Sequence, residues 1–248
     1  MQGRDISTTS HKLTKEPKKA ETNRQQVYAE AFPYQSVVGA LMYLAVHTRP
    51  DMSYTVNLLL RINNRPTYAA CQAALHTLLY LDNTVEHGIV FPNLTEEEPL
   101  RAYSDDDWAG DLDTSRSTTG YIVYLWGAPV ATSTMEAKCM AAYAAIQEIV
   151  WIRGVMTELG LKGFQLSKYA SPTILNVDSK SAIDMAQDPV KHKRSKHIRI
   201  KYHWIREQVG GNIIRLNHVP TAEMTADVMT KALPEKLHHQ HVNTVMVC

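Results

Sequence analysis

Hydrophobic residues recur at helical spacing through the first third of the chain, after a polar opening. Residues 1–30 are rich in Ser, Thr, Lys, Gln and Glu and lack an apolar period, which predicts a disordered leader. Three apolar stripes with helical spacing follow, at Val37–Leu44, Val56–Leu60 and Ala70–Leu81. Pro50, just before the second stripe, suits the first turn of a helix. Residues 31–95 are therefore predicted to form a small helical region.

The pattern changes after Gly88, where short apolar runs alternate with helical stretches. Four runs predict strands, at Leu100–Asp105, Tyr121–Leu125, Thr173–Val177 and Ile213–Val219. Helices are predicted over Ser179–Gln187 and His197–Val209, and Ser133-Thr134-Met135-Glu136 has the form of a capping box that would open a longer helix. This order predicts an α/β domain with a mixed sheet over residues 99–235, followed by an unpatterned tail at 236–248.

Composition and charge exclude only a few classes of protein. The chain has 248 residues, of which 44% are hydrophobic, so it can bury a core. Its formal net charge is +1, and any binding to nucleic acid must therefore come from local charge patterns. Cys71, Cys139 and Cys248 are odd in number and far apart, which argues against a disulfide framework or a zinc site. No run approaches the roughly 18 apolar residues of a membrane span, so we expect no membrane partner and no secretion.

Four carboxylates stand where a mixed sheet could bring them together. Asp105 and Asp178 end predicted strands, Glu136 opens the predicted long helix, and Asp227 lies in the last one. Clustered carboxylates repel one another, so such a group usually holds divalent cations, and Mg²⁺ suits oxygen ligands. Two ions roughly 4 Å apart would serve phosphodiester hydrolysis. Taken singly, each acid also fits an ordinary role as a cap, turn or solvated residue.

A basic stretch follows the third of these acids. Residues 191–206 contain no acid, and they predict binding to a nucleic-acid backbone by sequence-independent electrostatics. The residues expected to make these contacts are Lys191, Lys193, Arg194, Lys196, His197, Arg199, Lys201 and Arg206. The alternative interpretation is a solvated helix face.

Many short motifs, in one order, resemble the ribonuclease H region of copia-type retrotransposon Pol polyproteins. They include Tyr103-Ser104-Asp105, Asp107-Trp108-Ala109-Gly110-Asp111, Ser133-Thr134-Met135-Glu136-Ala137, Asp178-Ser179-Lys180-Ser181-Ala182, Val219-Pro220-Thr221, Ala226-Asp227 and Thr230-Lys231. Upstream, Thr48-Arg49-Pro50-Asp51 is similar to the thumb or connection region that follows the polymerase palm. The resemblance covers roughly residues 34 to 235.

The resemblance implies a ribonuclease H-like mixed sheet with flanking helices. It implies that Asp105, Glu136, Asp178 and Asp227 are the catalytic acids and hold two Mg²⁺ or Mn²⁺ ions, with no small-molecule cofactor. The expected partners are an RNA/DNA hybrid, whose RNA strand would be cut, and the rest of the Pol polyprotein. Contacts to 2′-hydroxyl groups would select the hybrid. The expected location is a cytoplasmic virus-like particle and the nucleus, and no polymerase active site is expected in this chain.

One departure from the family concerns the third strand of its sheet. The family has about ten further residues between positions such as Ala131 and Thr132, so this edge strand is expected to be shortened or missing here. An exposed second strand would weaken the fold. The alternative function is therefore a catalytically inactive remnant with residual nucleic-acid binding. An integrase-like nuclease on the same fold is a third reading, against which the order Asp, Glu, Asp, Asp argues.

Overall fold

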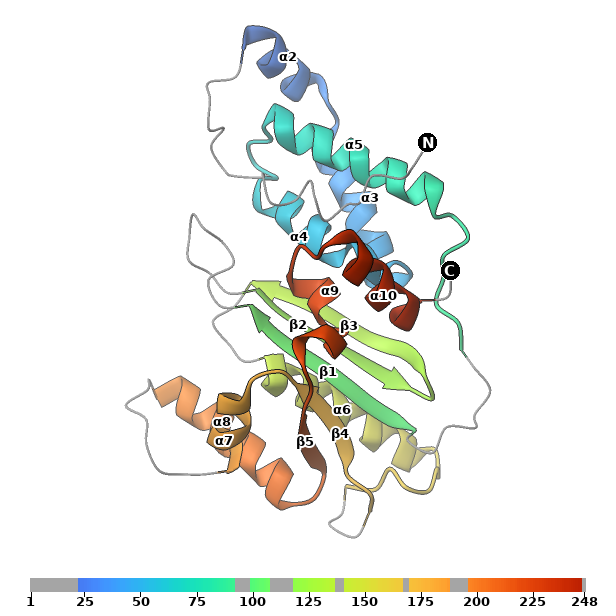
Figure 1. Cartoon of the computed structure of the whole chain (residues 1–248), viewed down its shortest axis with the longest axis vertical. Helices are drawn as coiled ribbons and strands as arrows, with labels where there is room; N and C mark the ends of the chain where they lie inside the picture. The colour runs from blue at the N-terminus through green and yellow to red at the C-terminus, as the bar shows by residue number, and fades with distance from the viewer. Residues whose placement is uncertain are drawn as a thin grey trace.

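The molecule consists of a helical part and a sheet part that pack against each other. The computed structural model describes residues 22–91, 99–107, 118–136, 141–166, 170–187 and 196–246. Helices α2 to α5 lie at one end of the molecule, and the sheet with its covering helices forms the rest (Figure 1). Within these residues, no helix combines the length and apolar character that crossing a membrane requires.

The helical part forms around the predicted apolar stripes. Its elements are α2 (Asn23–Ala31), α3 (Tyr34–His47), the 3₁₀ turn η1 (Pro50–Met52), α4 (Ser53–Arg61) and α5 (Tyr68–Asn83). Val38, Leu41 and Leu59 are among the buried residues of its core. Thr67 caps α5 by accepting a hydrogen bond from the amide of Ala70. The three predicted helices are thus confirmed.

Helix α2 lies partly inside the segment predicted to be a disordered leader. Thr22 and Gln25 form a capping box at its start, which satisfies two amide groups at the N-terminus of the helix. The helix packs on α5, with Ala29 buried. Because α2 has little apolar surface, its sequence shows no apolar period from which a helix could be predicted. The remainder of the leader, residues 1–21, lies outside the described residues.

A buried ion pair ties the turn η1 to the end of α5. Arg49 donates to both carboxylate oxygens of Asp51, with Nε to Oδ1 at 3.0 Å and Nη2 to Oδ2 at 2.8 Å. The hydroxyl of Tyr80 donates to the same carboxylate at 2.7 Å, and Arg49 reaches the carbonyl of Thr84 at 3.0 Å. Because buried charges need partners, this network accounts for a charged Arg-Pro-Asp turn inside the fold.

The sheet has five strands in the order β3-β2-β1-β4-β5. They are β1 (Leu100–Asp107), β2 (Thr118–Leu125), β3 (Ala128–Glu136), β4 (Thr173–Val177) and β5 (Ile214–His218). The first three strands are antiparallel neighbours, whereas β4 runs parallel to both β1 and β5. The predicted mixed sheet is confirmed, and β1 is its central strand.

The third strand is present, so the expectation that it is shortened or missing is wrong. Strand β3 pairs with β2 from Ala128 opposite Leu125 to Glu136 opposite Thr118. Trp126 and Gly127, with φ of 48° and 82°, form the two-residue turn between these strands. Positive φ at both central residues gives the turn the twist of a tight hairpin. The predicted capping box therefore lies in a strand, and helix α6 begins later, at Ala141.

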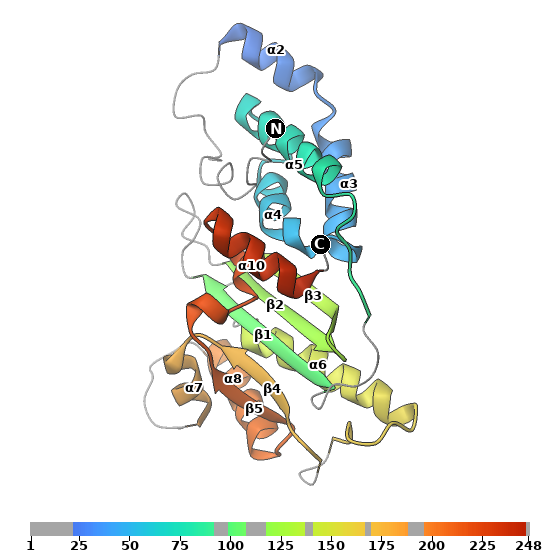
Figure 2. The same ribbon diagram turned by 45° about the vertical axis from the view of Figure 1, so that its right-hand side comes forward.

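Helices cover both faces of the sheet (Figures 1 and 2). Helices α6 (Ala141–Glu158), α7 (Lys180–Gln187) and α8 (Lys196–Gly210) pack on one face, in a core that includes Val123 and Ile149. On the other face, Ile122 and Tyr124 contact the short helix α9 (Asp227–Thr230) and α10 (Glu235–Val245). The turn η2 (Thr221–Glu223) leads from β5 to α9. Alternate residues of β2 thus enter different cores, as the pleat of a strand requires.

The prediction of an unpatterned tail is also wrong, because residues Glu235–Val245 form helix α10. Pro234 precedes its first residue, and Val242, Val245 and Met246 are buried against the sheet. His238 is buried as well, and its ring lies 6.4 Å from that of Tyr80 in α5. This tail therefore helps to join the helical part to the sheet part.

Candidate metal centre

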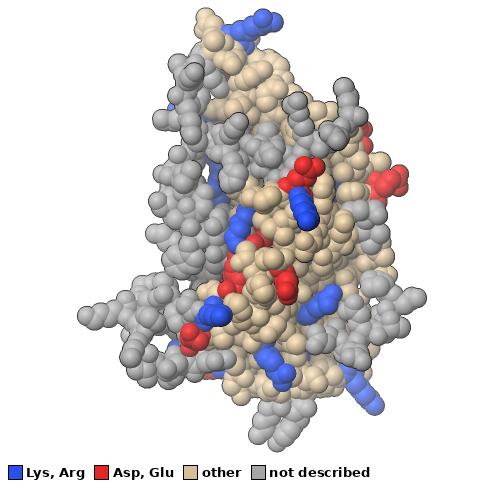
Figure 3. All heavy atoms as spheres, in the orientation of Figure 1, with Lys and Arg blue, Asp and Glu red and all other residues tan. Residues whose placement is uncertain are grey.

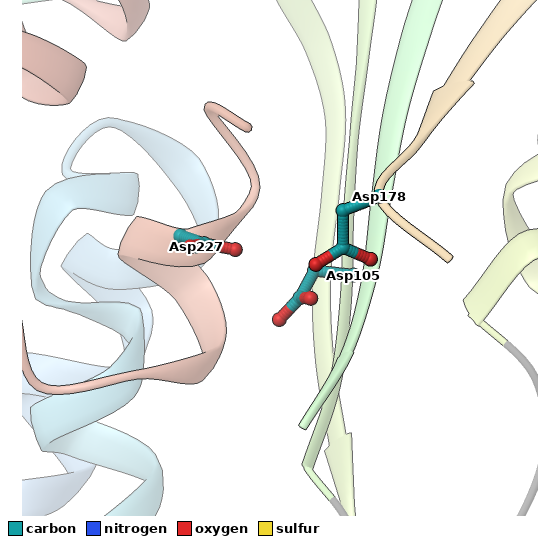
Figure 4. A group of neighbouring side chains, drawn as sticks. All are labelled: Asp105, Asp178 and Asp227. Atoms are coloured by element: carbon teal, nitrogen blue, oxygen red, sulfur yellow. The ribbon is translucent and has the colours of Figure 1, made fainter. Parts of the chain in front are cut away.

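Three aspartates from distant parts of the chain meet beside the central strand. Asp105 lies in β1, Asp178 directly follows β4, and Asp227 is the first residue of α9. Strands β1 and β4 are parallel, with Ser104 opposite Val177, so the residues that follow them come to the same end of the sheet. Figure 4 shows Asp227 facing Asp105 and Asp178 from the opposite side. One ligand oxygen from each residue lies within 4.8 Å of the other two.

Burial strengthens the electrostatic repulsion in this cluster. Asp105 and Asp227 are 1% and 0% exposed, whereas the side chain of Asp178 is 24% exposed. Burial, together with the charge of Asp105, raises the pKa of Asp227 from 3.8 to about 7. The same two causes raise the pKa of Asp178. The Oδ2 atom of Asp227 is buried and has no hydrogen-bond partner among the residues that the structure describes.

The ammonium group of Lys231 lies among the three carboxylates. Its Nζ is 3.0 Å from Oδ1 of Asp105 and 2.9 Å from Oδ1 of Asp227, and 3.9 Å from Oδ2 of Asp178. Burial alone would lower the pKa of Lys231, but Asp105 and Asp227 outweigh it and hold this pKa above its usual value. Acidic and basic side chains meet near the centre of the face in Figure 3, where α9 approaches the strands. The ammonium thus offsets part of the negative charge.

A second contact fixes the Asp105 carboxylate. The Thr230 hydroxyl, which is fully buried, donates to Oδ2 of Asp105. Asp105 therefore has one oxygen on Thr230 and the other on Lys231. Thr230 and Lys231 are part of the motif that resembles the family, but the motif alone assigns neither residue a role. The spacing of four residues between Asp227 and Lys231 is the signal that could have indicated the pair.

These residues meet the chemical requirements of a divalent cation. All the ligand atoms are carboxylate oxygens, which Mg²⁺ and Mn²⁺ prefer. The buried Oδ2 of Asp227 provides a coordination position that no group in the described part of the chain satisfies. The spread of the ligand atoms, within 4.8 Å, is compatible with coordination of one shared ion. The structure thus brings together three of the four predicted acids.

The fourth predicted acid, Glu136, occupies a different place from the one expected. Its backbone ends strand β3, opposite Thr118, while its side chain lies outside what the structure describes. Two strand spacings of about 4.8 Å separate β3 from β1, or about 10 Å across the sheet. The prediction that Glu136 opens a helix is wrong, and its role in the site stays a prediction.

The basic stretch is described only in part. Residues 191–195 and the side chains of Lys196, His197 and Arg199 lie outside the described part of the chain. Helix α8 begins at Lys196, as predicted to within one residue. The Lys201 ammonium lies 5.0 Å from the centre of the Tyr143 ring, and Arg206 donates to the carbonyl of Tyr202 at 3.2 Å. Nucleic-acid binding by this stretch stays a prediction.

The relatives of the chain decide its family. No protein-family model matches it. The chain is 40% identical over 210 residues to the retrovirus-related Pol polyprotein from transposon RE1 of Arabidopsis thaliana and 35% identical over 212 residues to that from transposon TNT 1-94 of Nicotiana tabacum. The matches cover 81% and 82% of this chain. It belongs to the copia-type transposon Pol polyproteins. The chain spans only 14% and 15% of the length of these two polyproteins.

A shorter protein and a solved structure are also similar to parts of the chain. Secreted RxLR effector protein 161 of Plasmopara viticola is 40% identical over 130 residues, which cover 48% of this chain and 91% of that protein. Among solved structures, LC11-RNase H1 in complex with RNA/DNA hybrid is 14% identical, with a TM-score of 0.38, over 53% of this chain and 93% of that one. The strand order and the Pol relatives together assign an RNase H-like domain to the sheet part.

A tetrapeptide of β1 also has the spacing of a polymerase motif. Tyr103-Ser104-Asp105-Asp106 fits Tyr-x-Asp-Asp, the form associated with polymerase active sites. Here these residues lie in the central strand, where all four pair with β2 and the first two also pair with β4. Asp105 contacts Lys231 and Thr230. The acids that accompany Asp105 are Asp178 and Asp227 of the sheet part. The tetrapeptide therefore belongs to the RNase H-like domain.

Proposed function

We propose that this chain hydrolyses the RNA strand of RNA/DNA hybrids with two divalent cations, Mg²⁺ or Mn²⁺. The observation that carries the proposal is the meeting of Asp105, Asp178 and Asp227, whose ligand oxygens lie within 4.8 Å of one another. Membership of the Pol polyprotein family supports the choice of substrate. The proposed division of the chain is a connection-like helical region at 31–95 and a nuclease domain at 99–235.

The protein contributes to this reaction by holding the acids in place. Bound divalent cations would supply a Lewis acid that activates water and stabilises the leaving oxygen. Asp105 is fixed by the Thr230 hydroxyl, and Asp227 is held by its position at the start of α9. Asp178, with a side chain that is 24% exposed, is the most open of the three described acids to solvent and to an approaching phosphate. Rigid support of this kind keeps ligands in a productive geometry.

The assay for this proposal uses a labelled RNA/DNA hybrid with Mg²⁺, followed by gel analysis of the RNA strand. Asp178→Asn is the principal variant because Asp178 is partly exposed, and its replacement should not prevent folding. Asp184→Asn, in an exposed position on α7, is the matched control. Cleavage by the wild type and by the control, but not by Asp178→Asn, would support the proposal. Equal background in all three would identify an inactive remnant.

Glu136 is proposed as the fourth acid and has its own test. Its backbone lies two strands from Asp105, so a contribution to the site requires its side chain to reach across β2. Glu136→Gln should abolish cleavage as fully as Asp178→Asn if Glu136 holds a cation. Retained cleavage in Glu136→Gln would limit the proposed ligands to Asp105, Asp178 and Asp227.

The basic stretch is proposed to hold the backbone of the hybrid. Replacing Lys191, Lys193 and Arg194 together with Ala should weaken hybrid binding, because each lost phosphate contact reduces the electrostatic part of the affinity. The slope of log affinity against log salt should fall by about 3 for three lost contacts. Unchanged affinity and slope would show that the stretch is only a solvated face.

A further inference from the structure

We infer that Lys231 is a built-in counter-cation of the metal centre, which pairs with the acids when no metal is bound and leaves them when a divalent cation binds. This inference rests on the proposed function, since it concerns the same three acids. It assigns Lys231 a positioning and affinity-setting role, separate from that of the acids themselves. The four acids predicted from the sequence do not by themselves assign a role to this lysine.

The first support is that Lys231 uses the same oxygens that a cation would use. Its ammonium contacts Oδ1 of Asp105 and Oδ1 of Asp227, at 3.0 Å and 2.9 Å. An ammonium and a divalent ion that share buried oxygens repel each other, because little water is present to screen them. Occupation by one cation must therefore weaken the binding of the other.

The second support is the charge of the cluster. When all three carboxylates are ionised they carry three negative charges, of which Lys231 offsets only one. Even with Lys231 in place, the buried Oδ2 of Asp227 has no partner within the described ranges of the chain. The lysine therefore satisfies the site incompletely. A divalent ion can offset more charge and use the remaining oxygen.

The third support is that Lys231 has a route out of the site. Helix α9 ends at Thr230, and Lys231 has extended backbone angles, with φ of −130° and ψ of 150°. Its side chain is 26% exposed, unlike those of Asp105 and Asp227. The flexible side chain of a lysine can turn toward solvent by rotation about its own bonds. The departure of the ammonium therefore does not require α9 to unfold.

The first experiment compares metal binding by the wild type, Lys231→Met and Lys231→Gln. Mn²⁺ is the probe, and free Mn²⁺ is followed by electron paramagnetic resonance as it is titrated with protein. Removing the competing ammonium should tighten Mn²⁺ binding on the order of tenfold, which corresponds to about 1.4 kcal/mol. The exposed Lys236→Met is the control and should bind like the wild type.

The outcomes separate this inference from the proposed function. Tighter binding in both Lys231 variants supports the inference. Equal, saturable binding in the wild type and the variants overturns the inference but leaves the metal centre intact. Absence of saturable binding in all proteins, including the wild type, overturns the proposed function as well. Lys231→Gln guards against misfolding, because Gln keeps hydrogen-bond donors toward the carboxylates.

A second experiment uses the unmodified protein and detects the movement directly. The protein is acetylated briefly with acetic anhydride, with and without saturating Mg²⁺, and each lysine is quantified by mass spectrometry. Acetylation of Lys231 should increase several-fold with Mg²⁺, because the ammonium leaves its carboxylate partners, whereas the exposed Lys236 should react equally in both conditions. Unchanged or reduced acetylation of Lys231, in a protein that binds Mn²⁺, would show that the lysine stays in the site and would overturn the inference.

Discussion

Replacing Asp227 with Asn should stabilise the metal-free protein at neutral and alkaline pH. The pKa of Asp227 is raised from 3.8 to about 7 by burial and by Asp105, so the folded protein holds its proton more tightly than the unfolded chain does. Protonation of Asp227 therefore contributes to the free energy of unfolding. This contribution is fully present below pH 3.8 and is lost as the pH rises through about 7. A shift of roughly 3 pKa units corresponds to about 4 kcal/mol. Asn carries no charge, so the variant avoids this loss.

The measurement is urea unfolding followed by circular dichroism in EDTA, at several values between pH 4.5 and 8. The gain for Asp227→Asn should approach about 4 kcal/mol at pH 8, as an upper bound, and shrink toward pH 4.5. The exposed Asp184→Asn should show no comparable trend. A variant that is no more stable than the wild type at pH 8, or a gain that does not change with pH, would refute the reasoning. Saturating Mg²⁺ should reverse the order, because only the wild type keeps all three acids.

Three other substitutions test contacts on which the fold depends, each by urea unfolding. Thr230→Val in EDTA should cost about 1–3 kcal/mol, because it leaves a buried oxygen of Asp105 without its hydroxyl donor. Arg49→Met should cost about 3–5 kcal/mol, since Asp51 is then a buried charge without its cation, whereas the exposed Arg65→Met should cost little. Gly127→Ala should cost about 1–2 kcal/mol because of its φ of 82°, whereas Gly39→Ala, in open space within α3, should stabilise the helix by about 0.5–1 kcal/mol. A change in stability of opposite sign for any of these variants would contradict the contact or the backbone conformation on which its prediction rests.

The hydrophobic period predicted most of the elements but failed where two patterns overlap. Ser133 to Glu136 satisfy the form of a capping box, yet Thr132, Ser133 and Thr134 also suit a strand. The outcome depends on Trp126 and Gly127, which close a two-residue hairpin and place the following residues beside β2. Trp is an unusual residue for positive φ, so the turn gave no clear signal in the sequence. Its ring packs on Phe164, a contact from a distant segment that local patterns do not contain.

The part of the candidate site that lies at the ends of strands could be predicted from the sequence. Asp105 and Asp178 come together because parallel neighbours finish at one end of a sheet, and a sequence that shows both strands also shows this. The sequence groups Asp227 with the other acids because it lies in the last predicted helix, but nothing in that four-residue helix indicates which face of the sheet α9 covers. Glu136 was misplaced together with the strand that contains it.

Lys231 was missed for a physical reason that bears on how the site works. Four residues separate it from Asp227, a spacing that on a regular helix gives a solvated surface pair of small energy. In this fold α9 ends at Thr230, and the extended backbone of Lys231 directs its ammonium to Asp105 in the central strand as well. Asp227, four residues before Lys231 in the sequence, is therefore also its neighbour in a buried cluster. The charge balance of the acids is consequently set by the end of a helix, and a change in the length of α9 should alter metal affinity without altering any acid.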